Sequence, residues 1–390
     1  MSLNIPFPQK QIPLKWLIGF LILLLFIILA VGLQPRGFRL ANKVKWIKEQ
    51  AGIRFSKYSI AYTHPWADMI LSQKSDTHGF SIVIALKPEK YRGSRFQFIL
   101  ALHNGNDSKQ LVMGQWRSWF IVMNGDDYAY RRKIKRISVD AANPASTSPQ
   151  ARLITITTTN DDGTKIYFDG NLVRTQKDLT LKIPPGGDTR LLVGNSVYGR
   201  HPWQGEIYGL AIYRYPLSSQ KAAIHFDRWA ENKTFEFAID DRPSLLYLFD
   251  EMGDIKAMDH SGGNHHLQIP PRMHVLKTEI LAPPWKHFKL NRMFGIDIII
   301  NLFGFMPFGF ILYAIFIRLG GAFEKQGVLI TVAICFSISF ALEIVQGWIP
   351  SRSSHMLDLL LNTLGGWMGA LSCRFFTKIQ GFRVQGSKIN

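Results

Sequence analysis

The sequence predicts a multi-domain membrane protein in which an antiparallel β-sandwich is inserted into a bundle of four membrane-spanning helices, one N-terminal and three C-terminal. Three observations predict it. Hydrophobic residues make up 47% of the 390 residues, but they concentrate at the two ends of the chain. The middle consists of short β-branched and aromatic runs separated by turn residues. Ionisable residues occur inside two apolar C-terminal stretches, where an unpaired charge costs several kcal/mol.

The N-terminal apolar stretch from Trp16 to Leu33 carries no charge and is bracketed by Lys15 and Arg36. At about 1.5 Å per residue it nearly crosses the hydrocarbon core of a bilayer. We therefore predict a membrane helix over residues 12–34, after a cytoplasmic N-terminus of residues 1–11. A cleaved signal peptide is the alternative. The apolar run is long for one and no clear A-x-A site follows, so we favour an uncleaved anchor.

Three further spans are predicted within residues 294–378, over residues 298–317, 327–349 and 356–376, and a basic tail of residues 379–390 follows. The formal charge of +18 gathers beside these segments, and no acidic residue occurs after Asp358. This placement favours anionic lipid headgroups as partners over nucleic acid, for which no binding motif is found. The basic tail also predicts a cytoplasmic C-terminus, and hence a sandwich outside the cell membrane.

The sandwich is predicted over residues 50–275, with a linker over residues 276–293. Turn signals such as Asn124-Gly125 and Pro185-Gly186-Gly187 separate its strands. One helix interrupts them, with Ser218 or Ser219 as its N-cap. The only cysteines, Cys335 and Cys373, lie in apolar segments, so the sandwich can hold neither a disulfide nor a cysteine-ligated zinc.

A polar cluster is predicted where the last two spans meet. Glu343 and Gln346 share one helix face, Asp358 and Asn362 share another, and Arg352 lies in the short turn between them. We expect Arg352 to reach one or both acids, because its guanidinium matches carboxylate geometry. Asn301 of the preceding span joins this cluster, and Gly365 and Gly369 form a G-x-x-x-G pair that lets a second helix approach closely.

The cluster leaves three interpretations open. It is a polar network that joins the helices, a pocket for an ionic headgroup or a lipid-linked glycan, or a catalytic acid and base. No nucleophile, metal-binding histidine set or phosphate-binding loop accompanies the acids, and His355 beside them is a lone histidine at a loop end.

Two resemblances are specific. The runs FSIVIALKP (Phe80 to Pro88), IYFDGNLV (Ile166 to Val173) and PWQGEIYGLAIYRYPLSSQKAAIHF resemble the LamG-like, concanavalin A-like jelly roll. LYLFDEMGDIKAMDHSGG (Leu246 to Gly263) resembles a phrase that usually opens that domain, but here it comes late. NLFGFMPFGFIL (Asn301 to Leu312), with E-x-x-Q, R and D-x-x-x-N-x-x-G, resembles the VanZ-like membrane family. That resemblance implies a cell-envelope role, and some of its members are linked to reduced susceptibility to glycopeptide antibiotics.

The jelly-roll resemblance implies carbohydrate binding. Trp116, Tyr128 and Tyr130 are candidates for stacking on sugar rings, whereas we assign Trp119 to the core. The hydrolases of this fold carry an E-x-D-x-E-like strand. None is found here and Glu206 lacks an acidic partner, so we do not expect hydrolysis.

No cofactor is predicted with the exception of calcium, which some relatives hold and which Asp126 and Asp127, or Asp161 and Asp162, can bind. Exposed turn residues are the plainer interpretation of both pairs. The histidines and aspartate of the sequence DHSGGNHH are a weaker metal candidate (Asp259, His260, His265 and His266). The basic run RRKIKR (Arg131 to Arg136) is expected on a strand or sheet edge, where it meets an anionic polymer or prevents aggregation.

We therefore favour a multi-pass envelope protein without enzymatic activity, whose outward sandwich binds a glycan and whose bundle anchors or senses it. The alternative is a membrane enzyme or transporter that acts on a lipid-linked substrate through Glu343, Arg352 and Asp358.

Overall fold

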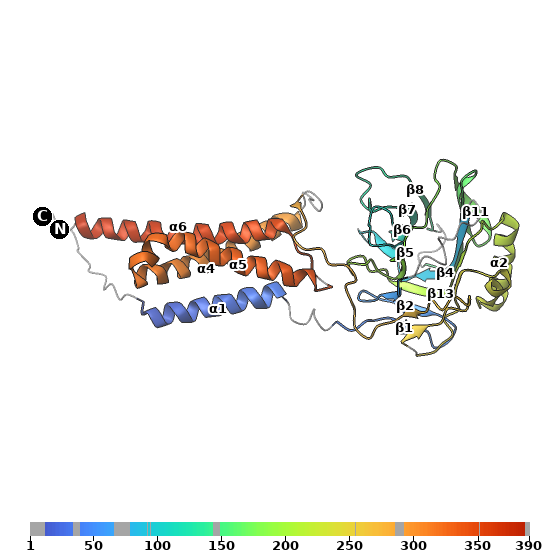
Figure 1. The fold of residues 1–390 in the computed structure, drawn as a ribbon, viewed down its shortest axis with the longest axis horizontal. Helices are drawn as coiled ribbons and strands as arrows, with labels where there is room; N and C mark the ends of the chain where they lie inside the picture. The colour runs from blue at the N-terminus through green and yellow to red at the C-terminus, as the bar shows by residue number, and fades with distance from the viewer. Residues whose placement is uncertain are drawn as a thin grey trace. The chain divides into compact units, whose positions relative to one another are not determined.

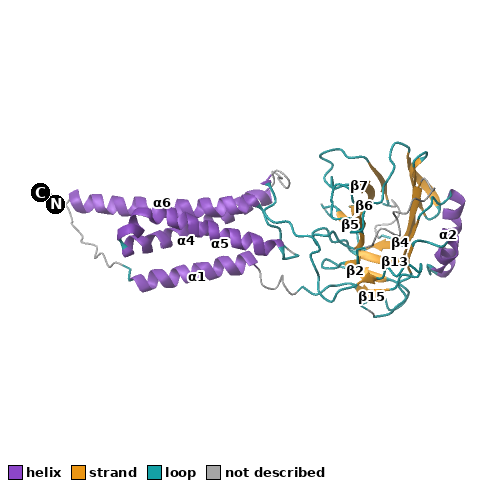
Figure 2. Cartoon of the chain, in the orientation of Figure 1, coloured by secondary structure: helices purple, strands orange, loops and turns teal. Residues whose placement is uncertain are grey.

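The chain forms two compact units, here called the sandwich (Arg39–Lys277) and the bundle (Met1–Phe38 with Thr278–Asn390). Both are seen in the computed structural model: the long helices lie in the bundle, and the strands lie in the sandwich together with the shorter helix α2 (Ser219–Asn232) (Figures 1 and 2). The structure describes residues 12–33, 40–65, 79–91, 93, 95–142, 149–253, 255–284, 292–350 and 352–386. Several predicted segments lie wholly or partly outside these residues. Among them are the N-terminus 1–11, residues 285–291 of the linker and residues 387–390 of the basic tail.

The first sheet of the sandwich is antiparallel throughout. Its strand β4 reads as a continuous apolar run because both of its faces are covered: Ile82 and Ile84 face the second sheet, and Val83 and Ala85 face a helical layer. The sheet runs in the order β1 (Lys45–Trp46), β2 (Ile53–Phe55), β13 (Gly205–Tyr213), β4 (Gly79–Pro88), β9 (Arg152–Thr159), β10 (Gly163–Phe168) and β11 (Asn171–Gln176), with β14 (Leu245–Tyr247) also paired to β13.

The second sheet is antiparallel as well. An apolar core fills the space between the two sheets, and Trp203 lies fully buried in it with its indole N–H donated to Gln115 Oε1 at 2.7 Å. This strand order is β15 (Lys256–Ala257), β16 (Leu267–Gln268), β3 (Ala61–Thr63), β12 (Arg190–Val193), β5 (Gln97–His103), β6 (Leu111–Trp116), β7 (Trp119–Asn124) and β8 (Arg136–Asp140). The predicted fold class is thus confirmed for this part of the chain.

Two short helices cover the outer face of the first sheet. These are α2 (Ser219–Asn232) and the 3-10 helix η2 (Glu236–Asp241) (Figure 1). Ser218 caps α2, because its hydroxyl accepts the N–H of Lys221 at 3.2 Å. Trp229 and Phe237 lie buried against the sheet, so β13 and β4 are covered on both faces.

The late phrase LYLFDE completes both sheets. Its strand β14 pairs with β13 of the first sheet, and β16, which follows it, pairs with β3 of the second. Between them, Asp259 accepts the backbone N–H groups of Leu246, Ser261 and His265 at 3.0–3.1 Å. The phrase that usually opens this domain therefore lies near its C-terminal end here, and the strands of this region still pair with both sheets.

Among the described residues, the bundle contains four long helices, which Figure 2 draws in purple. Leu21, Leu24, Leu25 and Ile28 form one face of the first helix, at helical spacing, and pack on the second. Among the described residues three helices are long and apolar enough to cross a membrane, and the fourth is less apolar because it carries Asp358, Asn362 and several glycines. The helices are α1 (Leu14–Leu33), α4 (Arg292–Leu319), α5 (Gly321–Gly347) and α6 (Met356–Gly386).

Helices α4 and α6 meet backbone to backbone. A Cβ added at Gly365 would lie 2.0 Å from the carbonyl oxygen of Leu302, and one at Gly369 would lie 2.0 Å from that of Met306. Gly309 of α4 faces Gly366 in the same way, at 2.2 Å. Only glycine fits at these positions, as the G-x-x-x-G spacing predicts for helices that approach closely.

Candidate functional site

The carboxylate of Glu343 lies at the beginning of α6. It is only 2% exposed, and its Oε2 accepts the backbone N–H of His355 at 2.7 Å, directly before α6 begins at Met356. The first N–H groups of a helix have no partner within the helix and carry partial positive charge. Glu343 therefore satisfies one of these N–H groups from a neighbouring helix.

Asp358 and Asn362 of α6 bind side chains on the two neighbouring helices. Asp358 lies in the first turn of α6 and accepts the side-chain N–H of Asn301 of α4 at 2.8 Å, as predicted. One turn further, Asn362 donates to the hydroxyl of Ser339 of α5 at 2.9 Å inside the bundle. These contacts tie α6 to α4 and to α5.

Arg352 does not pair with the acids. Its Nη2 donates to the carbonyl oxygen of Val31 at 2.6 Å, and Gln346 donates to that of Gly32 at 3.0 Å. Both carbonyls belong to the last turn of α1, where helical C=O groups lack partners and carry partial negative charge. The expected Arg352–Glu343 or Arg352–Asp358 fork is thus wrong: among the described residues neither acid lies within 4.0 Å of the guanidinium.

Each charge of the predicted cluster therefore lies at a helix end of opposite partial charge. The acids are at the N-terminus of α6, and Arg352 is at the C-terminus of α1. Side-chain types do not reveal the unpaired carbonyl oxygens of a helix end, so the sequence did not predict these contacts. The residues of the predicted cluster do lie together at one end of the bundle, but their contacts join the helices to one another.

A short backbone segment closes the same end. The Ala282 N–H donates to Ser354 O at 3.0 Å, and Met356 N–H donates to Ala282 O at 3.1 Å. The hydroxyl of Ser354 accepts the N–H of Leu281 at 2.9 Å, and that of Ser353 lies 2.9 Å from His355 Nε2. The loop before α6 is therefore fixed from both sides.

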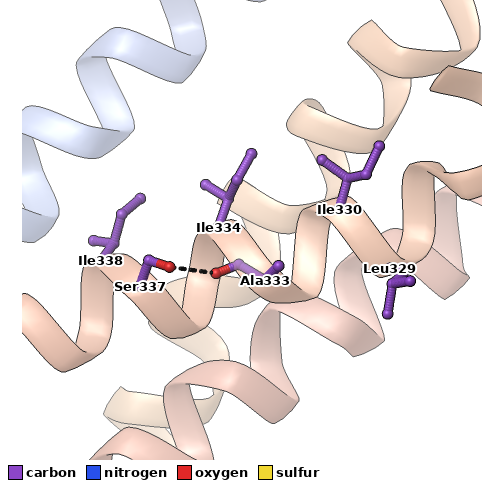
Figure 3. Close-up of a pocket in the computed structure, with 6 residues that line it drawn as sticks. All are labelled: Leu329, Ile330, Ala333, Ile334, Ser337 and Ile338. Atoms are coloured by element: carbon purple, nitrogen blue, oxygen red, sulfur yellow. Dashed lines mark hydrogen bonds between the residues drawn. The ribbon is translucent and has the colours of Figure 1, made fainter.

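An apolar cavity of about 420 Å³ lies along α5, away from these charges. Figure 3 shows Ile330, Ile334 and Ile338 pointing along one side of the helix. The only hydroxyl on it, that of Ser337, donates to Ala333 O at 2.8 Å (Figure 3). The surface suits a hydrocarbon chain and offers nothing to an ionic group.

In the sandwich, the hairpin of β6 and β7 presents two tryptophans. Trp116 and Trp119 are directly opposite in register and each is 37% exposed, so the expected core position of Trp119 is wrong. Between them Arg117 adopts φ 55°, and its guanidinium lies 4.8 Å from the centre of the Trp116 ring. The adjacent Gln115 fixes the turn, because its side-chain N–H₂ donates to Arg117 O at 2.7 Å and to Lys90 O at 2.9 Å.

The two predicted tyrosines differ in position. Tyr128 packs on Phe96 with ring centres 5.3 Å apart, and its hydroxyl accepts a hydrogen bond from Gln110 at 2.6 Å. Burial, with the nearby charge of Asp107, raises the pKa of this phenol. Tyr130 is 54% exposed, although Arg136 covers one face of its ring at 4.0 Å. Tyr130 thus retains an accessible ring, and Tyr128 belongs mainly to the packing.

The acidic pairs considered for calcium already have protein partners. Asp127 is buried and accepts the backbone N–H groups of Arg131 and Arg132 at 2.8 and 3.0 Å. Burial opposes the charge of Asp127, but these hydrogen bonds outweigh it and lower its pKa. Asp126 pairs with Arg132, and Asp162 pairs with Lys165 at 2.6 Å. The basic run lies in the loop around Asp127 and reaches a strand only at Arg136, so its placement on a strand or edge is corrected.

Sequence reasoning missed one ionic network. Asp107 accepts hydrogen bonds from His103 Nε2 at 3.0 Å, Tyr198 Oη at 2.6 Å and Lys277 Nζ at 3.0 Å. His103 Nδ1 accepts the N–H of Gly105 at 2.9 Å, which leaves Nε2 as the protonated nitrogen that donates to Asp107. Burial opposes the charge of Asp107, yet the three donors lower its pKa. No local motif foretells contacts between residues so far apart.

Comparison with protein families confirms both resemblances. Residues 66–223 match the concanavalin A-like lectin/glucanases superfamily, and residues 237–377 match the VanZ/LLP1 family. The chain carries a concanavalin A-like domain and a VanZ-like region. The VanZ-like match begins within the sandwich, at η2, and extends through α4, α5 and most of α6. No curated protein matches the sequence.

Solved structures with a similar sandwich include binding domains of botulinum neurotoxins. The receptor-binding domain of neurotoxin D has 14% sequence identity and a TM-score of 0.38, over 49% of this chain and 47% of that one. The receptor-binding domain of neurotoxin G has 18% identity and a TM-score of 0.36, over 50% of this chain and 46% of that one. The binding domain of neurotoxin DC in complex with SialylT has 13% identity and a TM-score of 0.39, over 49% of this chain and 46% of that one. The matched part spans less than half the length of those chains. At such identities and TM-scores the similarities carry no argument about a ligand.

Proposed function

We propose that this is a non-enzymatic binding protein of the cell envelope, whose sandwich binds a glycan and whose VanZ-like bundle anchors it in the membrane. The observation that carries the proposal is the exposed Trp116–Trp119 pair at the β6–β7 turn. Tryptophan faces stack on the apolar faces of sugar rings, and a cross-strand pair offers them from a rigid hairpin.

The surroundings of the hairpin favour a glycan with acidic groups. Arg117 lies in the turn itself, and Lys90 lies in the segment that Gln115 binds. Arg117 is a long cation beside the Trp116 ring, and no acidic side chain lies in the turn between the two tryptophans. A ring that stacks on Trp116 would therefore bring a carboxylate or phosphate substituent near a cation.

The bundle supports an anchoring role. Its acid, amide and arginine side chains join α1, α4, α5 and α6 at one end. Both chain connections to residues 39–277 leave from this end, because α1 finishes and α4 begins there. With a cytoplasmic basic tail, that end and the sandwich would be outside the cell.

The test measures glycan binding by the full-length protein in nanodiscs. We expect saturable binding to acidic glycans, and a rise in Kd of about tenfold or more in Trp116→Ala and Trp119→Ala, because a lost stacking contact of about 1.4 kcal/mol is a factor of ten. Leu172→Ala is the control, since this apolar side chain on β11 is also exposed (51%) and is not near the hairpin turn in sequence or pairing. No binding by the wild type, or equal loss in the Leu172 variant, would contradict the proposal.

The second candidate function is an enzyme or transporter for a lipid-linked substrate that uses Glu343, Arg352 and Asp358. The contacts of these residues do not favour it. Glu343 and Arg352 each bind a backbone group at a helix end, and Asp358 binds Asn301. A link to glycopeptide susceptibility remains a proposal from the family resemblance. It is tested by comparing susceptibility of cells with the wild type and with Glu343→Gln at equal amounts of membrane protein.

A further inference from the structure

A second cluster of charged side chains lies on the sandwich, in the connection that follows β14 and in the turn before β16. Asp250, Glu251 and His260 each offer one ligand atom, and these atoms lie within 4.8 Å of one another. His260 Nε2 is 3.7 Å from Asp250 Oδ1 and 3.6 Å from Glu251 Oε1. Of these residues, only His260 is a metal candidate from the sequence, and there it is grouped with Asp259, His265 and His266.

The distances are too long for direct hydrogen bonds between the imidazole and the carboxylates. They match what a shared metal ion produces. Two ligand atoms at about 2.0–2.2 Å from a tetrahedral ion are about 3.4 Å apart, so the observed distances need to close by only a few tenths of an ångström.

The cluster also lacks the cations that neutralise acids elsewhere in the chain. Among the described residues, no lysine or arginine lies within 4.0 Å of Asp250 or Glu251, although the chain as a whole carries a formal charge of +18. In addition, Oε2 of Glu251 is buried and has no hydrogen-bond partner there. A buried carboxylate oxygen without a partner is costly, and a bound cation removes that cost.

The cluster is anchored at two of its residues and remains accessible. Glu251 Oε1 accepts the backbone N–H of Met258, and the backbone N–H of His260 donates to Leu246 O at 2.8 Å. The side chains of Asp250, His260 and Glu251 are 52%, 33% and 15% exposed. An ion can therefore enter from solvent and keep a position open for water or for a ligand.

The neighbouring residues that the sequence suggested are already engaged. Asp259 accepts three backbone N–H groups, and His266 Nδ1 accepts the N–H of Asp259 at 3.1 Å. His260 is the member of that sequence that points to free carboxylates.

We propose that Asp250, Glu251 and His260 form a binding site for a divalent transition-metal ion of the Zn²⁺ class on the sandwich. The donor set gives the selectivity. Imidazole favours zinc and its neighbours in the first transition row, whereas calcium and magnesium prefer shells made of oxygen alone. The ion bridges the loop after β14 to the turn before β16, and so joins the segment that completes both sheets. The site is independent of the glycan proposal.

The test is calorimetric titration of the tag-free full-length protein in detergent, after treatment with a chelator. Zn²⁺, Ca²⁺ and Mg²⁺ are titrated separately. We expect one equivalent of Zn²⁺ to bind, with a higher Tm, and Kd to rise at least tenfold in His260→Gln and in Asp250→Asn. Asp240→Asn is the control, because this exposed carboxylate pairs with Arg228 and lies elsewhere.

Three results would overturn the proposal. They are the absence of saturable binding at one equivalent, Zn²⁺ binding that both variants retain, and Ca²⁺ binding as tight as Zn²⁺ that His260→Gln leaves unchanged. The two substitutions act on different side chains, and the Tm of each metal-free variant is compared with that of the wild type. If one variant is misfolded, the other decides.

Discussion

The interior of the sandwich and the interior of the bundle are packed by opposite kinds of residues. The interior of the sandwich is filled by large side chains, and Trp203, Tyr167 and Phe55 are almost completely buried. The closest contact in the bundle is made by Gly365 and Gly369, which let the backbone of α4 touch that of α6. The same chain thus uses its bulkiest and its smallest residues for the same purpose.

The difference follows from the solvent. In water, burial of apolar area stabilises by about 25 cal/mol per Å², so large side chains contribute most. Lipid tails are as apolar as leucine, and between membrane helices that gain is absent. Close van der Waals contact and polar contacts at helix ends must then supply the stability, as Arg352 and Glu343 do here.

Two glycines of the sandwich lie against aromatic rings. A Cβ added at Gly194 would meet the ring of Phe55 at 2.0 Å, and one at Gly209 would meet the ring of Phe235 at 2.1 Å. In both cases the obstacle is a side chain. At Gly365 and Gly369 it is backbone, which cannot rotate away without moving a helix.

The largest effect is expected for Gly369→Val. The added side chain would overlap the Met306 carbonyl, separate α4 from α6 and destabilise the bundle by about 3 kcal/mol or more. The measurement is the fraction of monodisperse protein after extraction, together with its Tm. Gly304→Val is the control, because no atom lies within 4 Å of a Cβ at that position of α4. Equal behaviour of the two variants would refute the close-contact explanation.

An intermediate effect is expected for Glu343→Ala. It leaves the His355 N–H without its acceptor at the beginning of α6, at a cost of about 2 kcal/mol. Glu343→Gln keeps an acceptor oxygen, so it should cost less than about half as much. Thermal unfolding in detergent measures both. If Glu343→Gln instead abolished cellular function while Tm and protein amount were unchanged, the catalytic or transport alternative would replace the anchoring role.

The smallest effect concerns the sandwich and pH. Because its folded pKa is lowered, Asp107 contributes stability above its ordinary pKa of 3.8, and this contribution disappears as pH falls below that value. The network is partly exposed, so we expect about 1 kcal/mol between the wild type and Asp107→Asn at pH 7. The difference should be constant from pH 7 to about pH 5 and shrink at more acidic pH. Denaturant unfolding followed by tryptophan fluorescence measures it, and a difference that grew on acidification would have the wrong sign.

The sequence predicts the fold class well because local patterns determine it. The apolar runs that became β4, β9 and β13 are bounded by turn residues, and Ser218 caps α2 as its position suggests. Asn301 and Asp358 also meet as predicted, because both lie on the facing sides of long helices.

The remaining contacts depend on acceptors that the sequence does not display. Arg352 was expected to bind a carboxylate, but the carbonyl oxygens at the end of α1 offered a nearer partner. Lys277 lies 170 residues from Asp107 along the chain, and only the tertiary fold brings the two together. Trp119 faces outward since it stands at a hairpin tip, where the alternation of the strand no longer decides exposure.

The bonds from Gln346 and Arg352 to the last turn of α1 bear on the processing of the chain. A signal peptidase that removed residues up to about position 33 would take away Val31 and Gly32 and strand both donors. Among the described residues Nε of Arg352 has no hydrogen-bond partner and is buried. Loss of the Nη2 bond to Val31 would leave a second donor of this side chain without its partner. These contacts agree with the prediction that the first helix is an uncleaved anchor.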